Sequence, residues 1–314
     1  MPANVLTVTL NPTLDVSTSV ARLIDHAKLR CTPELEQVGG GGINVAHVIH
    51  SLGGSCQAML PVGGSRGQDI LARLAASGLD CVTAAIEQQN RQCFTVYESE
   101  TGHEYRFVLP GPSLSPAEQD ACIAAICEHL PSDYLVLSGS LPPGVPDDFY
   151  ASIIGAARRI APELRVVVDT SGAPLKHALG AGVFMIKPSQ EEFCALTDQT
   201  FSDPLDGVSV CQALIAQVQA QVIALTLGAR GALLVTAQDA WRIEPLPVKV
   251  TSTVGAGDSF VGGFVWSLTQ NPDWIRAAQI GTAAATAALQ TQGELRFDSH
   301  AILKASQDVV ILPC

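Results

Sequence analysis

Lysine is scarce in this sequence of 314 residues, and acidic side chains outnumber basic ones. Lysine occurs only five times, Lys and Arg together number 18 against 30 Asp and Glu, and the formal net charge is −12. Proteins that hold a nucleic-acid duplex need a cationic surface that neutralises its phosphates. The composition therefore argues against a nucleic-acid partner.

Cysteine pairs of the C-x-x-C type and long apolar runs are also missing. The nine cysteines are scattered and odd in number, which disfavours zinc sites and disulfide frameworks and is typical of free thiols in a reducing compartment. No apolar run reaches the length of about 18 residues that a membrane span requires. The first residues enter an alternating apolar segment directly, without the parts of a signal peptide. We therefore expect a cytoplasmic protein with no membrane partner.

Two common nucleotide-binding motifs are absent as well. No Gly-Lys pair occurs, so the chain has no Walker P-loop. The run that begins at Gly39 reaches Asn44 at the position where the dinucleotide fingerprint requires its last glycine. These absences argue against a P-loop enzyme and against an oxidoreductase that uses a nicotinamide cofactor.

Apolar segments alternate with helical patterns along most of the chain. Apolar residues make up 47% of the sequence and aromatic residues only 5%, a balance typical of buried parallel strands and the helices that cover them. Four predicted buried strands end in polar or glycine-rich sequence; they cover residues 134–137, 165–168, 183–186 and 222–227. The ends of parallel strands lie along one edge of a sheet, where ligands bind. We therefore expect an α/β fold with its site at that edge.

A different pattern interrupts this alternation. Residues 92–98 and 103–109 alternate in polarity and are joined by a turn over 99–102, which predicts an antiparallel hairpin. Arg91 and Arg106 would lie at the end of the hairpin opposite its turn, and two guanidinium groups suit a phosphate. Earlier in the chain, Lys28-Leu29-Arg30 has the alternation of an exposed strand. Solvated surface charge is the alternative explanation for these four cations.

Two glycine-rich segments lead into predicted helices. The run Gly39–Gly42 is costly in backbone entropy, which indicates that a ligand or another backbone approaches it closely. Asn44 follows it and can bond to sugar hydroxyls. The second segment, Gly255-Ala256-Gly257, follows a β-branched stretch over 248–253 and offers free amides and a helix dipole to an anion.

Asp258 comes directly after this second segment. Its carboxylate could simply cap the helix. It could also accept the proton of a hydroxyl that attacks a phosphorus atom held by the glycine amides. The residue alone leaves both interpretations open.

These motifs together resemble the ribokinase-like carbohydrate kinases. The resemblance rests on the segment from Gly39 to Asn44, with Gly53 and Gly63 downstream, and on the segment from Thr253 to Asp258. It extends along essentially the whole chain and is greatest with the minor bacterial 6-phosphofructokinases. It implies one three-layer α/β domain over residues 1–314, with a mostly parallel central sheet and a β lid of about residues 14–35 and 90–108. A homodimer through that lid is also implied.

The resemblance further implies transfer of the γ-phosphoryl group of ATP to a sugar hydroxyl, with Mg²⁺. Asp258 would be the general base, beside an anion hole made by Gly255, Ala256 and Gly257. The sugar phosphate would be held by Asp15, Lys28, Arg30, Gly40, Gly41, Asn44, Arg91, Arg106 and Ser140. ATP would contact Lys187, Ser189, Thr226, Gly228, Gly231 and Thr253. Glu192 and Asp169 would lie on the metal side, and Ser189 replaces the Asn of the family's Asn-x-x-Glu motif.

Substrate choice rests on two local matches. Residues 39–44 and 105–111 resemble the corresponding segments of 6-phosphofructokinases, whereas 1-phosphofructokinases commonly have a lysine in the first and lack the arginine of the second. The implied reaction is phosphorylation of the C1 hydroxyl of fructose 6-phosphate. Tagatose-6-phosphate kinase and 1-phosphofructokinase remain as alternatives, and a non-catalytic sugar- or nucleotide-binding regulator is a more distant one.

Overall fold

The computed structural model describes residues 4–314 apart from 132, 202, 204, 219 and 292–296. Within this part of the chain, ten strands form one sheet in the order β14-β13-β12-β11-β10-β9-β8-β1-β4-β5. The seven strands from β11 to β5 run parallel to one another, and β12, β13 and β14 are antiparallel. Their bounds are β1 Val5–Val8, β4 Cys56–Val62, β5 Asp80–Ala85, β8 Tyr134–Ser138, β9 Arg165–Asp169, β10 Val183–Ile186, β11 Ala220–Thr226, β12 Ala232–Thr236, β13 Ala240–Ile243 and β14 Ile311–Pro313.

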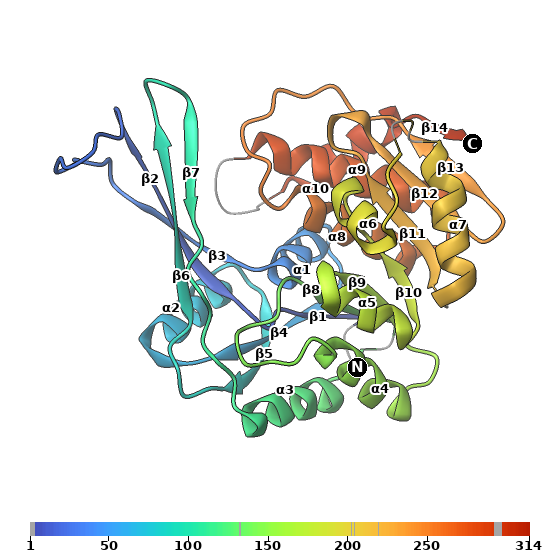
Figure 1. The fold of residues 1–314 in the computed structure, drawn as a ribbon, viewed down its shortest axis with the longest axis horizontal. Helices are drawn as coiled ribbons and strands as arrows, with labels where there is room; N and C mark the ends of the chain where they lie inside the picture. Colours follow the sequence, from blue (N-terminus) through green and yellow to red (C-terminus); the bar gives the residue numbers. More distant parts are fainter. Residues whose placement is uncertain (1–3, 132, 202, 204, 219, 292–296) are drawn as a thin grey trace.

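Helices cover both faces of this sheet and give three layers (Figure 1). One face carries α3 Pro116–Glu128, α4 Phe149–Ile160, α5 Gly172–Gly180, α6 Gln190–Thr197 and α7 Asp206–Val218. The other carries α1 Gly41–Ser51, α2 Gly64–Ala76, α8 Ala256–Gln270, α9 Trp274–Gln290 and α10 Ser299–Ala305. Both faces of the sheet are therefore shielded from solvent, which is why the central strands are nearly continuous apolar runs. No helix in the described residues is both long and apolar enough to cross a membrane.

A second, four-stranded sheet stands beside this body (Figure 1). Its order is β3-β2-β6-β7, with β2 Thr13–Val20, β3 Leu35–Gly39, β6 Arg91–Glu98 and β7 His103–Phe107. The hairpin predicted over 92–109 is confirmed, since β6 and β7 pair antiparallel across residues 99–102. Strand β2 joins the same sheet, parallel to β6 and antiparallel to β3. We call this sheet the lid.

One local prediction was wrong. Lys28-Leu29-Arg30 is not a strand but part of the long connection between β2 and β3. A three-residue alternation of charge carries no information about a pairing partner, and none forms there. The β-branched segment 248–253 leads into α8 as a loop outside both sheets.

The order of the strands places a crevice at the carboxyl end of β1. After β1 the chain passes through the lid and α1 to β4, which lies on one side of β1 in the sheet. After β5 it passes to β8, which lies on the other side of β1. Such a reversal opens a gap between neighbouring connections, where ligands bind in α/β sheets. The next four strands along the sheet end at Ser138, Asp169, Ile186 and Thr226. This is the edge that the polar strand ends predicted.

Candidate active site

Asp258 lies where the two glycine-rich helix entries meet. It stands in the first turn of α8, whose N-cap, Gly255, has φ of 74°. Asn44, in the first turn of α1, donates from Nδ2 to Oδ2 of Asp258 at 2.8 Å. Burial raises the pKa of the Asp258 carboxyl, while the hydrogen bond from Asn44 and the charge of Lys187 counteract the rise. A carboxylate tuned in this way and placed at a helix N-terminus is suited to proton abstraction.

Lys187 supplies a positive charge beside the anion hole. Its Nζ lies 3.2 Å from Oδ1 of Asp169 and is almost completely buried. A Cβ atom built on Gly257 would lie only 3.0 Å from this Nζ, so the ammonium group packs against the turn that opens α8. Burial alone would lower the pKa of Lys187, but Asp169, Asp258 and Glu192 more than offset this and raise it. The lysine is therefore cationic where phosphates would meet the glycine amides.

Asp169, the partner of this lysine, has an altered proton affinity. Burial, together with the charges of Asp258 and Glu192, raises the pKa of its carboxyl to about 7 against the opposing charge of Lys187. The carboxyl groups of Asp169, Asp258 and Glu192 thus all act on one ammonium group.

The two glycines that open α1 are required by packing. A Cβ on Gly41 would lie 2.2 Å from Oγ of Ser138, and one on Gly42 would lie 2.6 Å from the carbonyl oxygen of Val8. The α1 entry therefore sits directly on the ends of β1 and β8. Thr9 completes this contact, because its Oγ1 accepts a hydrogen bond from the amide of Ile43 at 2.9 Å.

Asp15 and two arginines form the sugar side of the site. Asp15 lies on β2, where burial raises its pKa and Thr13, Arg106 and Arg91 act to lower it, so both cations are near the carboxylate. Arg91 also connects the segments that contain Asn11 and Leu109. Its NH2 group donates to the carbonyl oxygen of Asn11 at 3.1 Å, and its NH1 group donates to the carbonyl oxygen of Leu109 at 3.4 Å.

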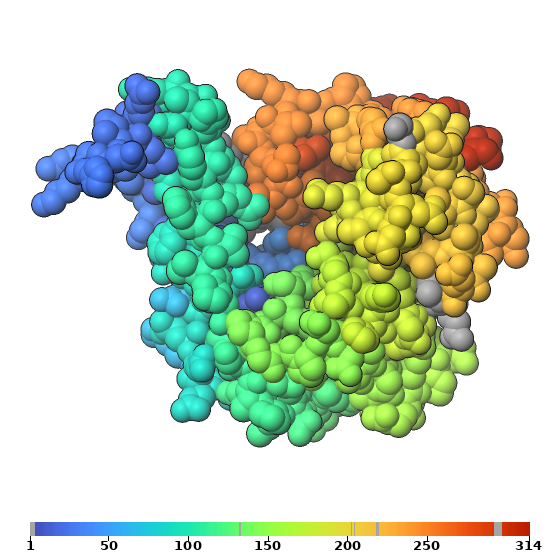
Figure 2. Space-filling view, viewed as in Figure 1, coloured from blue at the N-terminus to red at the C-terminus, as the bar shows by residue number. Residues whose placement is uncertain are grey.

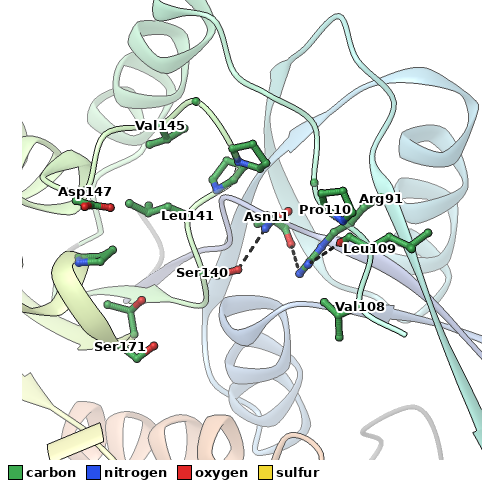
Figure 3. A pocket seen from close by; sticks show the side chains of 16 residues that line it. Asn11, Arg91, Val108, Leu109, Pro110, Ser140, Leu141, Val145, Asp147 and Ser171 are labelled. Atoms are coloured by element: carbon green, nitrogen blue, oxygen red, sulfur yellow. Dashed lines mark hydrogen bonds between the residues drawn. The ribbon is translucent and has the colours of Figure 1, made fainter. Parts of the chain in front are cut away.

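A cavity of about 630 Å³ opens beside Arg91 (Figure 3). Asn11 lies between Ser140 and Arg91, and its Nδ2 donates to Oγ of Ser140 at 3.2 Å. The remaining walls come from the strand-end loops 108–111, 140–147 and 170–174. Figure 2 shows a hollow where the lid, the strand-end loops and the segment around residue 255 meet. Arg91, Asn11 and Ser140 are thus gathered on one side of the cleft.

Two of the predicted cations are not brought to this side of the cleft. Lys28 and Arg30 lie in the β2–β3 connection, which projects away from the body (Figure 1). Gly40, Gly41 and Asn44 do lie near Asp258 as a group.

The predicted nucleotide residues lie along the ends of β10 and β11. Ser189 and Thr226 form an isolated bridge between the two segments, and Oγ1 of Thr226 donates to the carbonyl oxygen of Pro188 at 3.3 Å. Gly228 begins the short 3₁₀ turn Gly228–Arg230, and Gly231 follows it with φ of 86°. Thr253 is exposed in the loop before α8.

Ser189 and Glu192 form a capping box at the start of α6. The Ser189 hydroxyl accepts from the amide of Glu192 at 3.2 Å, and Oε2 of Glu192 accepts from the amide of Ser189 at 2.7 Å. Helix capping therefore explains this Ser-x-x-Glu pair without a metal. Among the described residues no group of three or more His, Cys, Asp or Glu is placed to hold a metal by itself. Mg²⁺ usually needs only one or two carboxylates together with phosphate oxygens.

Two residues of the site escaped sequence reasoning. Asn11, in the loop after β1, donates a hydrogen bond to Ser140, and Ser138, the last residue of β8, lies beside Gly41. The available signal was the rule that a polar residue ending a buried strand faces the ligand edge. Applied to the end of β8, this rule pointed to Ser140 and missed Ser138, the last residue of the strand.

Comparisons with known proteins show which family the chain belongs to. The model of the pfkB family of carbohydrate kinases matches residues 21–298. The chain is 38% identical over 290 residues to ATP-dependent 6-phosphofructokinase isozyme 2 of Mycobacterium tuberculosis, with 92% of this chain and 85% of the relative covered. It is 37% identical over 297 residues to the protein of the same name in Escherichia coli, covering 94% and 95%.

Solved structures extend the likeness to the fold. The crystal structure of Escherichia coli phosphofructokinase-2 in complex with fructose-6-phosphate superposes with a TM-score of 0.90 at 34% identity and covers 98% of this chain and 99% of that one. A tetrameric inhibited form of the same enzyme is also similar, with a TM-score of 0.89, 35% identity and coverage of 97% and 99%. A 1-phosphofructokinase of Xanthomonas campestris is 29% identical over 321 residues, covering 99% of each chain. The expected ribokinase-like fold is confirmed, and the chain belongs to the pfkB family of carbohydrate kinases.

Proposed function

We propose that this chain is an ATP-dependent 6-phosphofructokinase, which converts fructose 6-phosphate and ATP to fructose 1,6-bisphosphate and ADP. The observation that carries the proposal is the meeting of Asp258, the start of α8 and Lys187 at one point of the cleft. The relatives that share more than a third of the sequence bear the name of this activity.

Asp258 performs the proton transfer in this proposal. The oxygen of the C1 hydroxyl attacks the γ-phosphorus, its proton passes to the Asp258 carboxylate, and the bond from that phosphorus to the β–γ bridging oxygen breaks to release ADP. Asn44 holds the other side of the carboxylate through Oδ2. The base thereby keeps one orientation toward the hydroxyl.

The amides at the start of α8 and Lys187 stabilise the transferred group. Phosphoryl transfer needs positioning and neutralisation of charge on the phosphate oxygens more than it needs covalent chemistry. The Gly255-Ala256-Gly257 backbone offers free amides there, and Lys187 lies against the same turn. The ammonium group and the helix dipole act on the same oxygens.

The carboxylates around Lys187 fit a Mg²⁺ ion. Asp169 gives one oxygen to Lys187, and Glu192 gives one to the Ser189 amide, so each has a second oxygen for the ion or for its bound waters. A bound Mg²⁺ would neutralise charge on the phosphate groups of ATP. The charges of Asp258 and Glu192 raise the pKa of Asp169, and a bound cation would oppose that rise.

Arg91 and Arg106 are assigned to the phosphate already present on the sugar, and Asp15, Gly40, Gly41 and Ser140 to its hydroxyls. The nearness of both arginines to Asp15 supports this assignment. Thr226, Gly228, Gly231 and Thr253 are assigned to the side of ATP. The nine cysteines are free thiols, which is compatible with the cytoplasm, where we place the reaction.

A homodimer through the lid is part of the proposal. Side chains opposite each other in a sheet share a face, and the face that bears Val16, Phe94, Tyr105 and Phe107 is the one opposite Asp15 and Arg106. Phe94 is 38% exposed and Phe107 is 50% exposed. A second copy of the lid would cover this apolar face.

Product identification tests the proposed reaction. Phosphorus NMR of a mixture of the protein, fructose 6-phosphate and Mg-ATP should show one new phosphomonoester on C1 for each ADP formed. ADP together with inorganic phosphate, and no bisphosphate, would reject the proposal in favour of simple ATP hydrolysis. The likeness to 1-phosphofructokinases makes fructose 1-phosphate the second candidate acceptor.

A further inference from the structure

Ser138 occupies the point where three structural elements converge. It is the last residue of β8 and pairs with Asp169, the last residue of β9. A Cβ built on Gly41 would lie 2.2 Å from Oγ of Ser138 and 3.1 Å from Oδ1 of Asp258. Because Gly41 has no side chain, Oγ of Ser138 and Oδ1 of Asp258 both border the space where its Cβ would be. The Ser138 hydroxyl and the Asp258 carboxylate are therefore neighbours.

The hydroxyl of Ser138 has no other evident use. Only 1% of the residue is exposed, and its Oγ has no recorded hydrogen-bond partner among the described residues. A buried hydroxyl without a partner costs about 1 to 3 kcal/mol, and an alanine here would avoid that cost. The residue is also distinct from Ser140, which is exposed and hydrogen-bonded to Asn11.

We propose that Ser138 is a positioning residue for Asp258: its hydroxyl approaches Oδ1 from β8 while Asn44 holds Oδ2 from α1. The proposal rests on the kinase function proposed above. The two donors fix the carboxylate from opposite sides, so a small rotation of the base away from the attacking hydroxyl is resisted. The Asn44 bond alone leaves the carboxylate free to turn about Oδ2.

The electrostatics agree with this arrangement. Burial raises the pKa of Asp258, and the hydrogen bond from Asn44, the charge of Lys187 and, after these, the nearby Ser138 hydroxyl act to lower it. A donor that lowers a carboxyl pKa interacts with its charged form, and the charged form is the one a general base needs.

The need for positioning also gives Gly41 a second reason to lack a side chain. Any Cβ at that position would push the Ser138 hydroxyl away and crowd Oδ1 of Asp258. The glycine run before α1 thus keeps the base and its second donor in contact, besides any role in binding sugar.

The test is a double-mutant cycle of Ser138→Ala and Asp258→Asn, with the best acceptor that the wild-type protein accepts. Ser138→Ala should lower kcat about 10²-fold, the loss typical of a misplaced catalytic group, and should leave both KM values within about twofold. In the Asp258→Asn background the same change should have little further effect, because residues that act as a unit are not additive.

Thr7→Val is the matched control. Thr7 lies on the neighbouring strand β1, is fully buried, and also has an Oγ1 without a recorded partner, but it has no place in the site. It should leave kcat unchanged, and thermal unfolding should verify that each variant folds.

Three results would overturn the proposal. In the first, Ser138→Ala has the same kcat as Thr7→Val. In the second, Ser138→Ala raises a KM and leaves kcat unchanged. In the third, the fold decreases in kcat caused by Ser138→Ala and Asp258→Asn multiply in the double mutant. If Asp258→Asn itself had no effect on kcat, the proposed function of Asp258 would fail, and this is distinguishable from a failure of Ser138 alone.

Discussion

Asp258 accepts a hydrogen bond from Asn44 through Oδ2, and its replacement by Asn separates the shape of the side chain from its chemistry. Asp258→Asn preserves the size and the position in the first turn of α8 but cannot take up a proton. We expect kcat to fall by about 10² to 10⁴, the usual contribution of a general base, with a small change in the KM for ATP.

Asp273→Asn is the control for this substitution, because Asp273 starts α9 by accepting from the amides of Ile275 and Arg276. Asn caps a helix as well as Asp does, so this variant should keep both activity and stability. An Asp258→Asn enzyme with wild-type turnover would show that the carboxylate only caps α8.

Arg106 bears on recognition of the sugar phosphate. Arg106→Ala removes a cation close to Asp15 on the lid, and a lost charged hydrogen bond of about 1.5 to 3 kcal/mol corresponds to a rise of roughly 10- to 100-fold in KM. Steady-state kinetics should show this rise for the sugar phosphate and little change for ATP. Arg159→Ala, on an exposed position of α4, should change neither; equal rises for both substrates would remove Arg106 from the sugar side.

At the scale of elements, the sequence predicted the regular parts well. The strands over 134–137, 165–168, 183–186 and 222–227 agree with β8, β9, β10 and β11, because each is a nearly continuous apolar run. The hairpin was predicted from alternating polarity, and the helix entries were predicted from their glycines.

What the sequence could not supply was the long-range geometry. That Arg91 would bind the carbonyl oxygens of Asn11 and Leu109, or that Ser138 would face Gly41, depends on residues far apart in the chain. The connection that contains Lys28 and Arg30 was mistaken for a strand because local alternation does not reveal whether a neighbouring strand exists. The Ser189–Glu192 capping box was visible in the sequence but was interpreted only through its resemblance to a metal motif.

The turn between β11 and β12 gives a prediction at this scale. Gly231 and Gly228 both have positive φ, but a Cβ on Gly231 would lie 2.0 Å from the carbonyl oxygen of Ile243, whereas Gly228 has open space. Gly231→Ala should therefore lower the free energy of unfolding by about 3 kcal/mol or more. Gly228→Ala should lower it by only about 1 kcal/mol.

Denaturant unfolding of the two variants checks this difference. A Gly231→Ala protein of normal stability that had lost only its affinity for ATP would contradict the steric argument and would leave nucleotide contact as the reason for this glycine.

At the scale of the whole molecule, the uncovered face of the lid predicts self-association. Phe107→Asp places a charge on the apolar face, next to Phe94 on the facing strand, and should convert the proposed homodimer to monomers in light scattering. Tyr97→Asp, at a similarly exposed aromatic residue on the opposite face, should leave the dimer intact. Dissociation by both variants, or by neither, would argue against the lid as the interface.

The central claim is the identity of the acceptor, and a coupled assay of ADP release at fixed Mg-ATP tests it most directly. The kcat/KM values should be compared for fructose 6-phosphate, tagatose 6-phosphate, fructose 1-phosphate and ribose. The account predicts the highest value for fructose 6-phosphate and the lowest for ribose, which offers Arg91 and Arg106 no phosphate. A clear lead for any other acceptor, or no ADP with any of them, would contradict it.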